Sequence, residues 1–298
     1  MYSQGLIYFL LCLQFSTFSL LRSILKDTTP ICTILLYSEV IKLIICCFFV
    51  NDIKSKIFTE KIIIVPTFLF IIMNIISYNV ISEISATSYV TLMQLKLPAT
   101  CILSYFTLQQ NFTCQKVFSI FLIFICSVNI CKEKQVTNQY IGNKNILFSL
   151  LEVILSSICG VYLQKIFRGK DHIWIRNLEL CIFSIPVYII LVHNNESTFI
   201  TTHTGLIFSV IAASGGILVA LSLLHCGAVG KTLVSSVSLV LVTIIEHVLY
   251  KKIPRFNTIT FYTIIISSIF YYNHDLIKFY ETNSLHSRRP LLEEESGM

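Results

Sequence analysis

A lysine inside an apolar stretch is the strongest chemical feature of the sequence. The run 84–108 is largely apolar but contains Gln94 and Lys96. An ionisable side chain at the centre of a membrane helix costs about 2.5–3.5 kcal/mol on insertion scales, so such residues usually face a partner or a water-filled pathway. Lys96 is therefore the first candidate for a ligand contact.

The neighbours of Lys96 fit a binding surface. Tyr89 precedes Lys96 by seven residues, which places both side chains on roughly one face of a helix, about 10 Å apart along its axis. An aromatic ring and a cation on one face can bind a nucleobase and a phosphate. Pro98 removes a backbone donor, and membrane helices tolerate this where neighbours or a cavity satisfy the freed carbonyl. We therefore expect the helix to bend or break beside Lys96.

The composition indicates that these residues lie in a lipid bilayer. The chain has 298 residues, of which 55% are hydrophobic and 13% charged, and its mean hydropathy is +0.76. These values exclude an ordinary soluble domain. A spanning helix needs about 20 apolar residues, and we expect an all-α membrane protein of ten transmembrane helices, the first of them not a cleavable signal peptide. Their approximate bounds are 5–25, 31–50, 62–82, 84–108, 114–132, 144–166, 174–193, 204–225, 228–250 and 257–277.

Ten spans divide into two sets of five. An odd number of helices per repeat inverts the second copy relative to the first, a transporter design in which the site lies at the repeat interface. The sequence thus predicts a first five-helix repeat over 1–132, a polar connection over 133–143 and a second five-helix repeat over 144–277. A polar segment over 278–298 is expected to be a disordered cytosolic tail.

Lys231 is the expected counterpart of Lys96 in the second repeat. It ends the segment 227–231, Gly-Ala-Val-Gly-Lys, whose glycines allow close packing or local unwinding. Two alternatives stay open. Lys96 pairs with an acid such as Glu246 or Glu152, or Lys231 extends to the membrane interface without any ligand.

The order of these residues resembles the nucleotide-sugar transporters over nearly the whole chain. It is similar in particular to the branch of CMP-sialic acid, UDP-galactose and UDP-N-acetylglucosamine transporters, ten-helix members of the drug/metabolite transporter superfamily. The matching features are Glu39-Val40-Ile41-Lys42, Val65-Pro66, Asn74, Tyr89, Gln94-Leu95-Lys96, Gly160-Val161-Tyr162, Lys165, Trp174, Arg176-Asn177, Gly215-Gly216 and Lys231.

The resemblance implies an antiporter of the Golgi or endoplasmic reticulum membrane that imports a cytosolic nucleotide sugar and exports the nucleoside monophosphate. It implies that five positions contact nucleotide or phosphate: Asn74, Tyr89, Lys96, Asn177 and Lys231. Closing the carrier without substrate would then be unfavourable, because it would desolvate Lys96 and Lys231 while neither is paired with a phosphate. At about 4 Å and an effective dielectric of about 20, each lysine–phosphate pair contributes about 4 kcal/mol before desolvation.

The sugar end departs from the sialic-acid branch, which favours hydroxyl-bearing side chains there. The pocket expected at this end is smaller and less polar and is formed by Cys181, Phe183, Val219 and Ala220. These departures favour UDP-N-acetylglucosamine and/or UDP-galactose as the substrate and UMP as the exchanged product. Glu39 and Lys42, three residues apart, can neutralise each other and are expected to form a structural or gating pair.

Further departures leave the function open. Ser85, Val90, Gly227 and Ala228 stand where the family usually has acid or amide side chains. The alternatives are a CMP-sialic acid transporter, another carrier of the superfamily, or a membrane interaction subunit that has lost transport.

The remaining patterns indicate neither an enzyme nor a metal protein. The eleven cysteines include no Cys-x-x-Cys pair, and the seven histidines show no metal spacing, so we expect no metal and no cofactor. The sequence shows no Ser/His/Asp or Cys/His arrangement and no paired carboxylates of a catalytic site. Its basic residues are scattered, so we do not expect nucleic-acid binding. A homo-oligomer stays open.

Orientation follows from charge. With both termini in the cytosol, eleven Lys and Arg fall on cytosolic segments and eight on the opposite side, in agreement with the positive-inside rule. The glycosylation signal at Asn195 would then face the lumen, and the one at Asn111 the cytosol.

Overall fold

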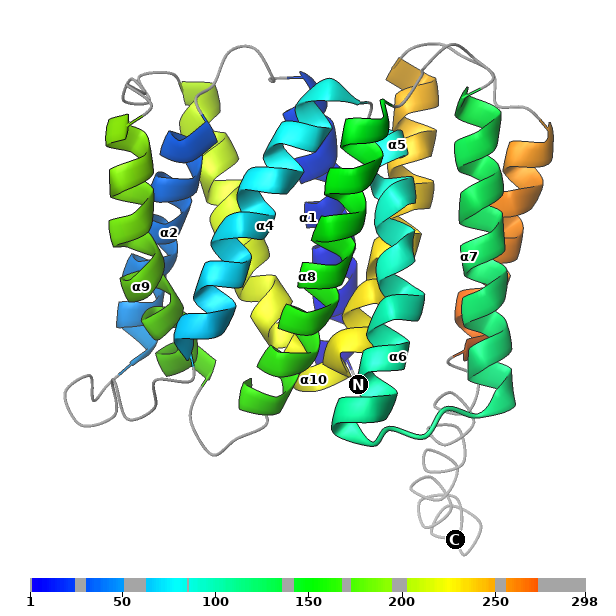
Figure 1. The fold of residues 1–298 in the computed structure, drawn as a ribbon, viewed down its shortest axis with the longest axis horizontal. Helices are drawn as coiled ribbons and strands as arrows, with labels where there is room; N and C mark the ends of the chain where they lie inside the picture. Colours follow the sequence, from blue (N-terminus) through cyan, green and yellow to red (C-terminus); the bar gives the residue numbers. More distant parts are fainter. Residues whose placement is uncertain are drawn as a thin grey trace, which may run out of the picture.

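The protein is a bundle of helices that run roughly along one axis (Figure 1). The computed structural model describes residues 2–24, 31–50, 63–84, 86–135, 142–167, 173–194, 203–249 and 256–272. Within these ranges there is no strand, so the all-α prediction is confirmed there. The expected tail 278–298 and residues 136–141 of the expected connection lie outside them.

The helices follow the apolar runs of the sequence. In chain order they are α1 (Tyr2–Ile24), α2 (Ile31–Phe49), α4 (Ile64–Glu83), α5 (Ala86–Leu92), the 3₁₀ turn η2 (Met93–Leu95), α6 (Lys96–Leu108), α7 (Cys114–Gln135), α8 (Asn143–Phe167), α9 (Ile173–Asn194) and α10 (His203–Leu249). A further helix covers 256–272.

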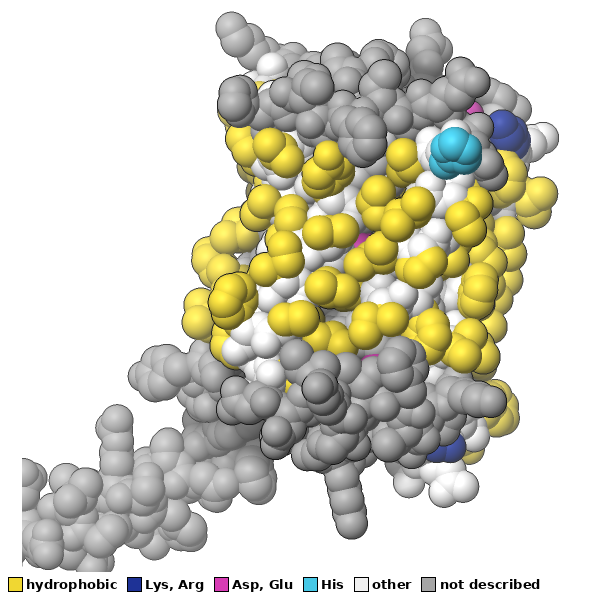
Figure 2. All heavy atoms as spheres, turned by 90° about the vertical axis from the view of Figure 1, so that its left-hand side faces the viewer, with side chains coloured by type: hydrophobic (Ala, Val, Ile, Leu, Met, Phe, Trp, Pro, Cys, Tyr) yellow, Lys and Arg dark blue, Asp and Glu magenta, His cyan; other side chains and the backbone are white. Residues whose placement is uncertain are grey.

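The distribution of side chains is that of a protein in lipid. Large apolar residues cover the outside as a broad band (Figure 2), and Phe48 is 81% exposed. Small polar side chains such as Thr87 and Ser149 lie fully buried inside. Among the described residues, six helices are long and apolar enough to cross a membrane. The chain is therefore a multi-pass membrane protein, and the full count of ten spans stays a prediction.

The expected helix 84–108 is broken beside Lys96. The 3₁₀ turn η2 separates α5 from α6, and Pro98 follows it in the first turn of α6. Because proline has no N–H, it cannot donate to the carbonyl four residues earlier, that of Gln94. Separately, the side-chain amide of Gln94 joins this segment to α10. It donates to the Ser235 carbonyl at 3.1 Å and accepts from the Ser236 hydroxyl at 2.6 Å. We call this contact the Gln94 brace.

Helix α10 consists of two limbs that meet at Gly227. This glycine has φ 75° and ψ 177°, a conformation essentially restricted to glycine. The next backbone N–H, that of Ala228, donates to the Gln164 side-chain oxygen at 2.8 Å. The limbs form a V (Figure 1), and both contact α1, since Gln14 donates to the Ile211 carbonyl and Ser16 to the Ser238 carbonyl.

Candidate functional site

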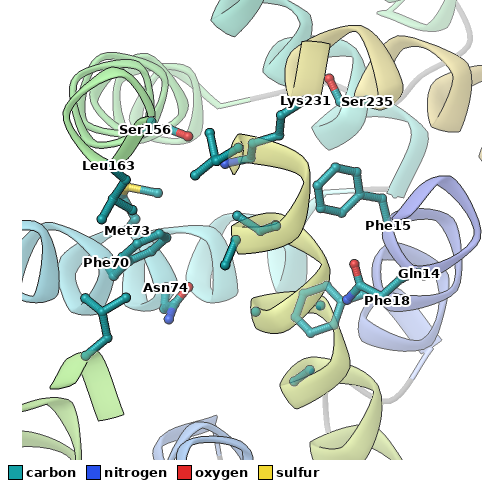
Figure 3. Close-up of a pocket in the computed structure, with 18 of the residues that line it drawn as sticks. Gln14, Phe15, Phe18, Phe70, Met73, Asn74, Ser156, Leu163, Lys231 and Ser235 are labelled. Atoms are coloured by element: carbon teal, nitrogen blue, oxygen red, sulfur yellow. The ribbon is translucent and has the colours of Figure 1, made fainter. Parts of the chain in front are cut away.

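A cavity of about 280 Å³ lies in the middle of the bundle. Side chains from α1, α2, α4, α5, α6, α8, α9 and α10 line it, and they combine aromatic and aliphatic groups with a few polar ones (Figure 3). Small-molecule sites are typically apolar hollows of about 300–1,000 Å³ with a few polar groups that orient the ligand. The cavity has this character and lies near the lower end of this range.

The cavity brings together the five residues predicted to contact nucleotide or phosphate. They come from five different helices, and they are Asn74, Tyr89, Lys96, Asn177 and Lys231. Residues far apart in the sequence thus line one cavity. Their contact with a ligand stays a prediction.

Lys96 and Tyr89 share one acid. The Lys96 ammonium lies 2.9 Å from Oε1 of Glu152, and the Tyr89 hydroxyl donates to the same oxygen at 2.8 Å. Glu152 belongs to α8 and is 3% exposed. Of the two acids considered for Lys96, the partner is Glu152. The second, Glu246, accepts from the backbone N–H and the hydroxyl of Thr87.

Lys231 differs from Lys96 in having no such acid. It extends from α10 into the cavity (Figure 3). None of the ion pairs among the described residues includes its ammonium. The alternative that Lys231 reaches the membrane interface does not hold in this arrangement, because its side chain points to the centre of the bundle.

Glu39 and Lys42 form the expected pair, with 2.7 Å between Oε1 and Nζ. The Ser184 hydroxyl donates to the second Glu39 oxygen at 2.9 Å. Both residues of the pair line the same cavity as Lys96 and Lys231, a location that the sequence did not indicate. Gly216 gives Lys42 its room, since a Cβ on Gly216 would lie 3.3 Å from the Lys42 ammonium.

The two asparagines also bond within the protein. The Asn74 amide donates to the Tyr188 hydroxyl at 3.1 Å, and the Asn177 amide donates to the Ile173 carbonyl at 3.2 Å. The first bond joins α4 to α9, and the second stays within α9. Asn74 therefore fits a contact between helices as well as a ligand contact.

The residues expected at the sugar end are only partly at the cavity surface. Val219 and Ala220 line it. Phe183 packs beside them in a common apolar cluster, while Cys181 is fully buried and its carbonyl accepts from the Ser184 hydroxyl. Among the residues described, Cys181 and Phe183 thus stand behind the lining.

Sequence reasoning missed several polar groups of the lining, which belong to α1, α6, α8 and α9: Gln14, Thr100, Ser156, Ser184 and Tyr188. Each is a common residue type in an apolar helix, where a hydroxyl or amide by default bonds within or between helices. The sequence signal that could have identified them is weak. It is a polar residue that shares a helix face with a glycine or with another polar residue.

Comparisons with known proteins define the family. The family model described as "Nucleotide-sugar transporter" matches residues 12–273. The chain therefore belongs to the nucleotide-sugar transporter family, which confirms the resemblance drawn from its sequence. Because the family consists of transporters, the chain is not an enzyme.

Curated relatives include UDP-sugar transporters. The UDP-galactose/UDP-N-acetylglucosamine transporter of Caenorhabditis elegans is 24% identical over 268 residues, covering 79% of this chain and 72% of the relative. The UDP-galactose transporter of Schizosaccharomyces pombe is 27% identical over 244 residues, covering 70% and 68%. A solved crystal structure matches with a TM-score of 0.70 and 12% identity over 91% of this chain and 96% of the matched chain, a likeness that establishes the fold alone.

Proposed function

We propose that the protein exchanges a cytosolic UDP-sugar, UDP-N-acetylglucosamine and/or UDP-galactose, for luminal UMP. The observation that carries the proposal is that Lys96 and Lys231 both line one central cavity. Two cations that line one cavity are suited to a diphosphate, because each stabilises its negative charge. The UDP-sugar transporters of Caenorhabditis elegans and Schizosaccharomyces pombe among the relatives support a UDP-sugar as the substrate.

In this proposal, each part of the lining has a task. Lys231 attracts the phosphate first, since no acid in the described chain holds it, and Lys96 completes the contact. Tyr89 stacks on or borders the base, while Asn74 and Asn177 offer amide groups for its polar edges. The less polar wall at Val219 and Ala220 faces the sugar and accommodates more than one hexose.

We also propose the membrane arrangement that this mechanism needs. Ten spans form two inverted five-helix repeats, 1–132 and 144–277, joined by 133–143 and followed by the cytosolic tail 278–298. Both termini lie in the cytosol, and the membrane is that of the Golgi or the endoplasmic reticulum. The V of α10 at Gly227 supports this count, because it turns one long apolar segment, Thr204–Leu249, into two opposed limbs.

Exchange in proteoliposomes tests the proposal. Purified protein is reconstituted with or without internal UMP, and uptake of labelled UDP-N-acetylglucosamine and UDP-galactose is measured. We expect uptake of the labelled UDP-sugar to rise strongly when the vesicles contain UMP. Either UDP-sugar, added unlabelled outside, should inhibit this uptake. Inhibition by CMP-sialic acid alone at comparable concentration would instead identify a CMP-sialic acid carrier.

A thermal-shift screen distinguishes a UDP-sugar carrier from a carrier of another substrate class and from a subunit without transport. A ligand that binds only the folded state stabilises it by about 2.7 kcal/mol at 100 times its Kd. Stabilisation by UMP and UDP-sugars supports the UDP-sugar carrier, whereas stabilisation by sugar phosphates or amines without a nucleobase indicates another superfamily carrier. No stabilisation by any of these compounds supports an interaction subunit without transport.

A further inference from the structure

Glu152 is a buried acid with only half of its bonding capacity used. Its Oε1 accepts from both Tyr89 and Lys96, at 2.8 and 2.9 Å. Its Oε2 is buried and has no hydrogen-bond partner among the described residues. A buried charged oxygen without a partner is costly, so an acid that served the fold alone would be expected to bond both oxygens.

The acid lies just behind the cavity wall. Glu152 does not line the cavity, while Lys96, Tyr89 and Ser156, one turn along α8, all do. Lys96 thus stands between the fixed carboxylate and the space that a phosphate would occupy. An anion in the cavity and the carboxylate of Glu152 would share one ammonium.

Two of the three described lysines that line the cavity are paired with an acid. Glu39 compensates Lys42, and Glu152 compensates Lys96. Lys231 is left without an acid among the described residues. The expectation that an empty carrier desolvates two unpaired lysines on closing therefore needs correction, because Lys96 already carries its own counter-anion.

We propose that Glu152 is a positioning residue that stands in for the substrate phosphate at Lys96 when the cavity is empty. It holds Lys96 and Tyr89 in place, lowers the cost of closing the empty carrier, and competes with the incoming phosphate. Its charge therefore permits some transport without exchange and weakens nucleotide binding. This inference rests on the proposed function, since it needs a phosphate-bearing substrate in this cavity.

Glu152→Gln isolates the charge. The amide keeps an oxygen that can accept from Tyr89 and Lys96, but it no longer repels a phosphate. We expect UMP to bind on the order of tenfold tighter to the purified full chain, measured by calorimetry, because a like charge close to the ligand is removed. We also expect uptake of UDP-sugar into empty vesicles to fall several-fold relative to uptake into UMP-loaded vesicles.

Glu246→Gln is the matched control. It makes the same change at another buried acid, which holds Thr87 and does not line the cavity. UMP affinity and the ratio of loaded to empty uptake should stay at their wild-type values. The double variant Lys96→Gln/Glu152→Gln tests the route of the effect, since without Lys96 the change at Glu152 should tighten UMP binding far less.

The outcomes distinguish this inference from the proposed function. If wild-type protein binds UMP and folded Glu152→Gln binds it equally or more weakly, Glu152 has a structural role only. If wild-type protein binds no nucleotide, the proposed function fails and the inference with it. Should Glu152→Gln not fold, Glu152→Leu also removes the charge. Because leucine leaves Lys96 and the Tyr89 hydroxyl without this acceptor, only the ratio of loaded to empty uptake is compared for this variant; it should rise, and an unchanged ratio would contradict the inference.

Discussion

Cations inside this bundle are mostly held by acids from the same or a neighbouring helix. Lys42 pairs with Glu39 within α2, Arg176 lies 3.0 Å from Glu179 within α9, and Lys96 reaches across to α8. Removing one partner of a buried pair leaves an uncompensated charge, which costs about 3–5 kcal/mol. Lys231 is the contrasting case, because its removal strands no acid among the described residues.

The two cavity lysines should therefore respond differently to alanine. We expect Lys96→Ala and Lys231→Ala both to abolish UMP-dependent exchange, since each removes a proposed phosphate contact. Lys96→Ala should also destabilise the fold by about 3–5 kcal/mol because it leaves Glu152 unpaired, whereas Lys231→Ala should be neutral or stabilising. Thermal unfolding in detergent and the proteoliposome assay measure the two effects.

A surface lysine provides the reference for this pair. Lys144 is 71% exposed and lies 4.0 Å from Glu83, a type of contact that contributes little. Lys144→Ala should change neither exchange nor unfolding. A lower unfolding midpoint for Lys231→Ala than for Lys96→Ala would contradict the assignment of Glu152 as a dedicated partner.

At the scale of the element, the turn inside α10 decides where Lys231 stands. Gly227 ends one limb in a conformation with positive φ, and Lys231 follows one turn into the next limb. Gln164 of α8 caps the new limb at Ala228. The position of the lysine thus depends on one glycine and on one amide from a neighbouring helix.

Gly227→Ala should loosen this turn. A Cβ there would lie 2.9 Å from the Gln164 side-chain nitrogen, and a non-glycine residue in this backbone region costs about 1–3 kcal/mol. We expect a lower thermal unfolding midpoint together with weaker UMP binding. Gly5→Ala is the control: it lies in α1 with nothing within 4 Å of a new Cβ, and alanine should be neutral or stabilising there.

At the scale of the whole molecule, the ends of the bundle can be told apart. The N-terminus and the connection between α6 and α7 lie at one end, and α9 finishes at Asn194 at the opposite end (Figure 1). The glycosylation signal at Asn111 lies in the connection between α6 and α7, and the signal at Asn195 follows the last described residue of α9 in the sequence. Their modification reports which end faces the lumen.

With both termini in the cytosol, only Asn195 should carry a glycan. Expression in cells with a secretory pathway, followed by endoglycosidase treatment, should give a mobility shift that Asn195→Gln removes and Asn111→Gln leaves intact. A shift that depends on Asn111 would reverse the proposed orientation.

The sequence predicts the cavity residues better than their bonds. The seven-residue spacing of Tyr89 and Lys96 places both on one face, and both reach Glu152. Helices are predictable because apolar runs of membrane length have few other structures open to them. Which acid pairs with Lys96 is not predictable in this way, since it depends on how α6 and α8 pack.

Helix ends are where the sequence and the structure differ. Arg22 lies near the end of the expected helix 5–25, and the charge count includes it on the non-cytosolic side. In the structure it is 1% exposed, lies over the Tyr78 ring and donates to the Tyr78 carbonyl at 2.7 Å. Likewise, the sequence predicts a bend or break at Pro98, and the structure has a 3₁₀ turn a few residues ahead of it, at Met93–Leu95. The position of a charge near a helix end depends on tertiary packing, which hydropathy does not contain.

The Gln94 brace has a consequence for how such a carrier moves. Its hydrogen bonds to Ser235 and Ser236 join the segment that carries Lys96 to the α10 limb that carries Lys231. If Lys96 and Lys231 bind the phosphate as proposed, we expect these two lysines to keep their spacing during transport, and the cavity to open and close through the helices on its other side.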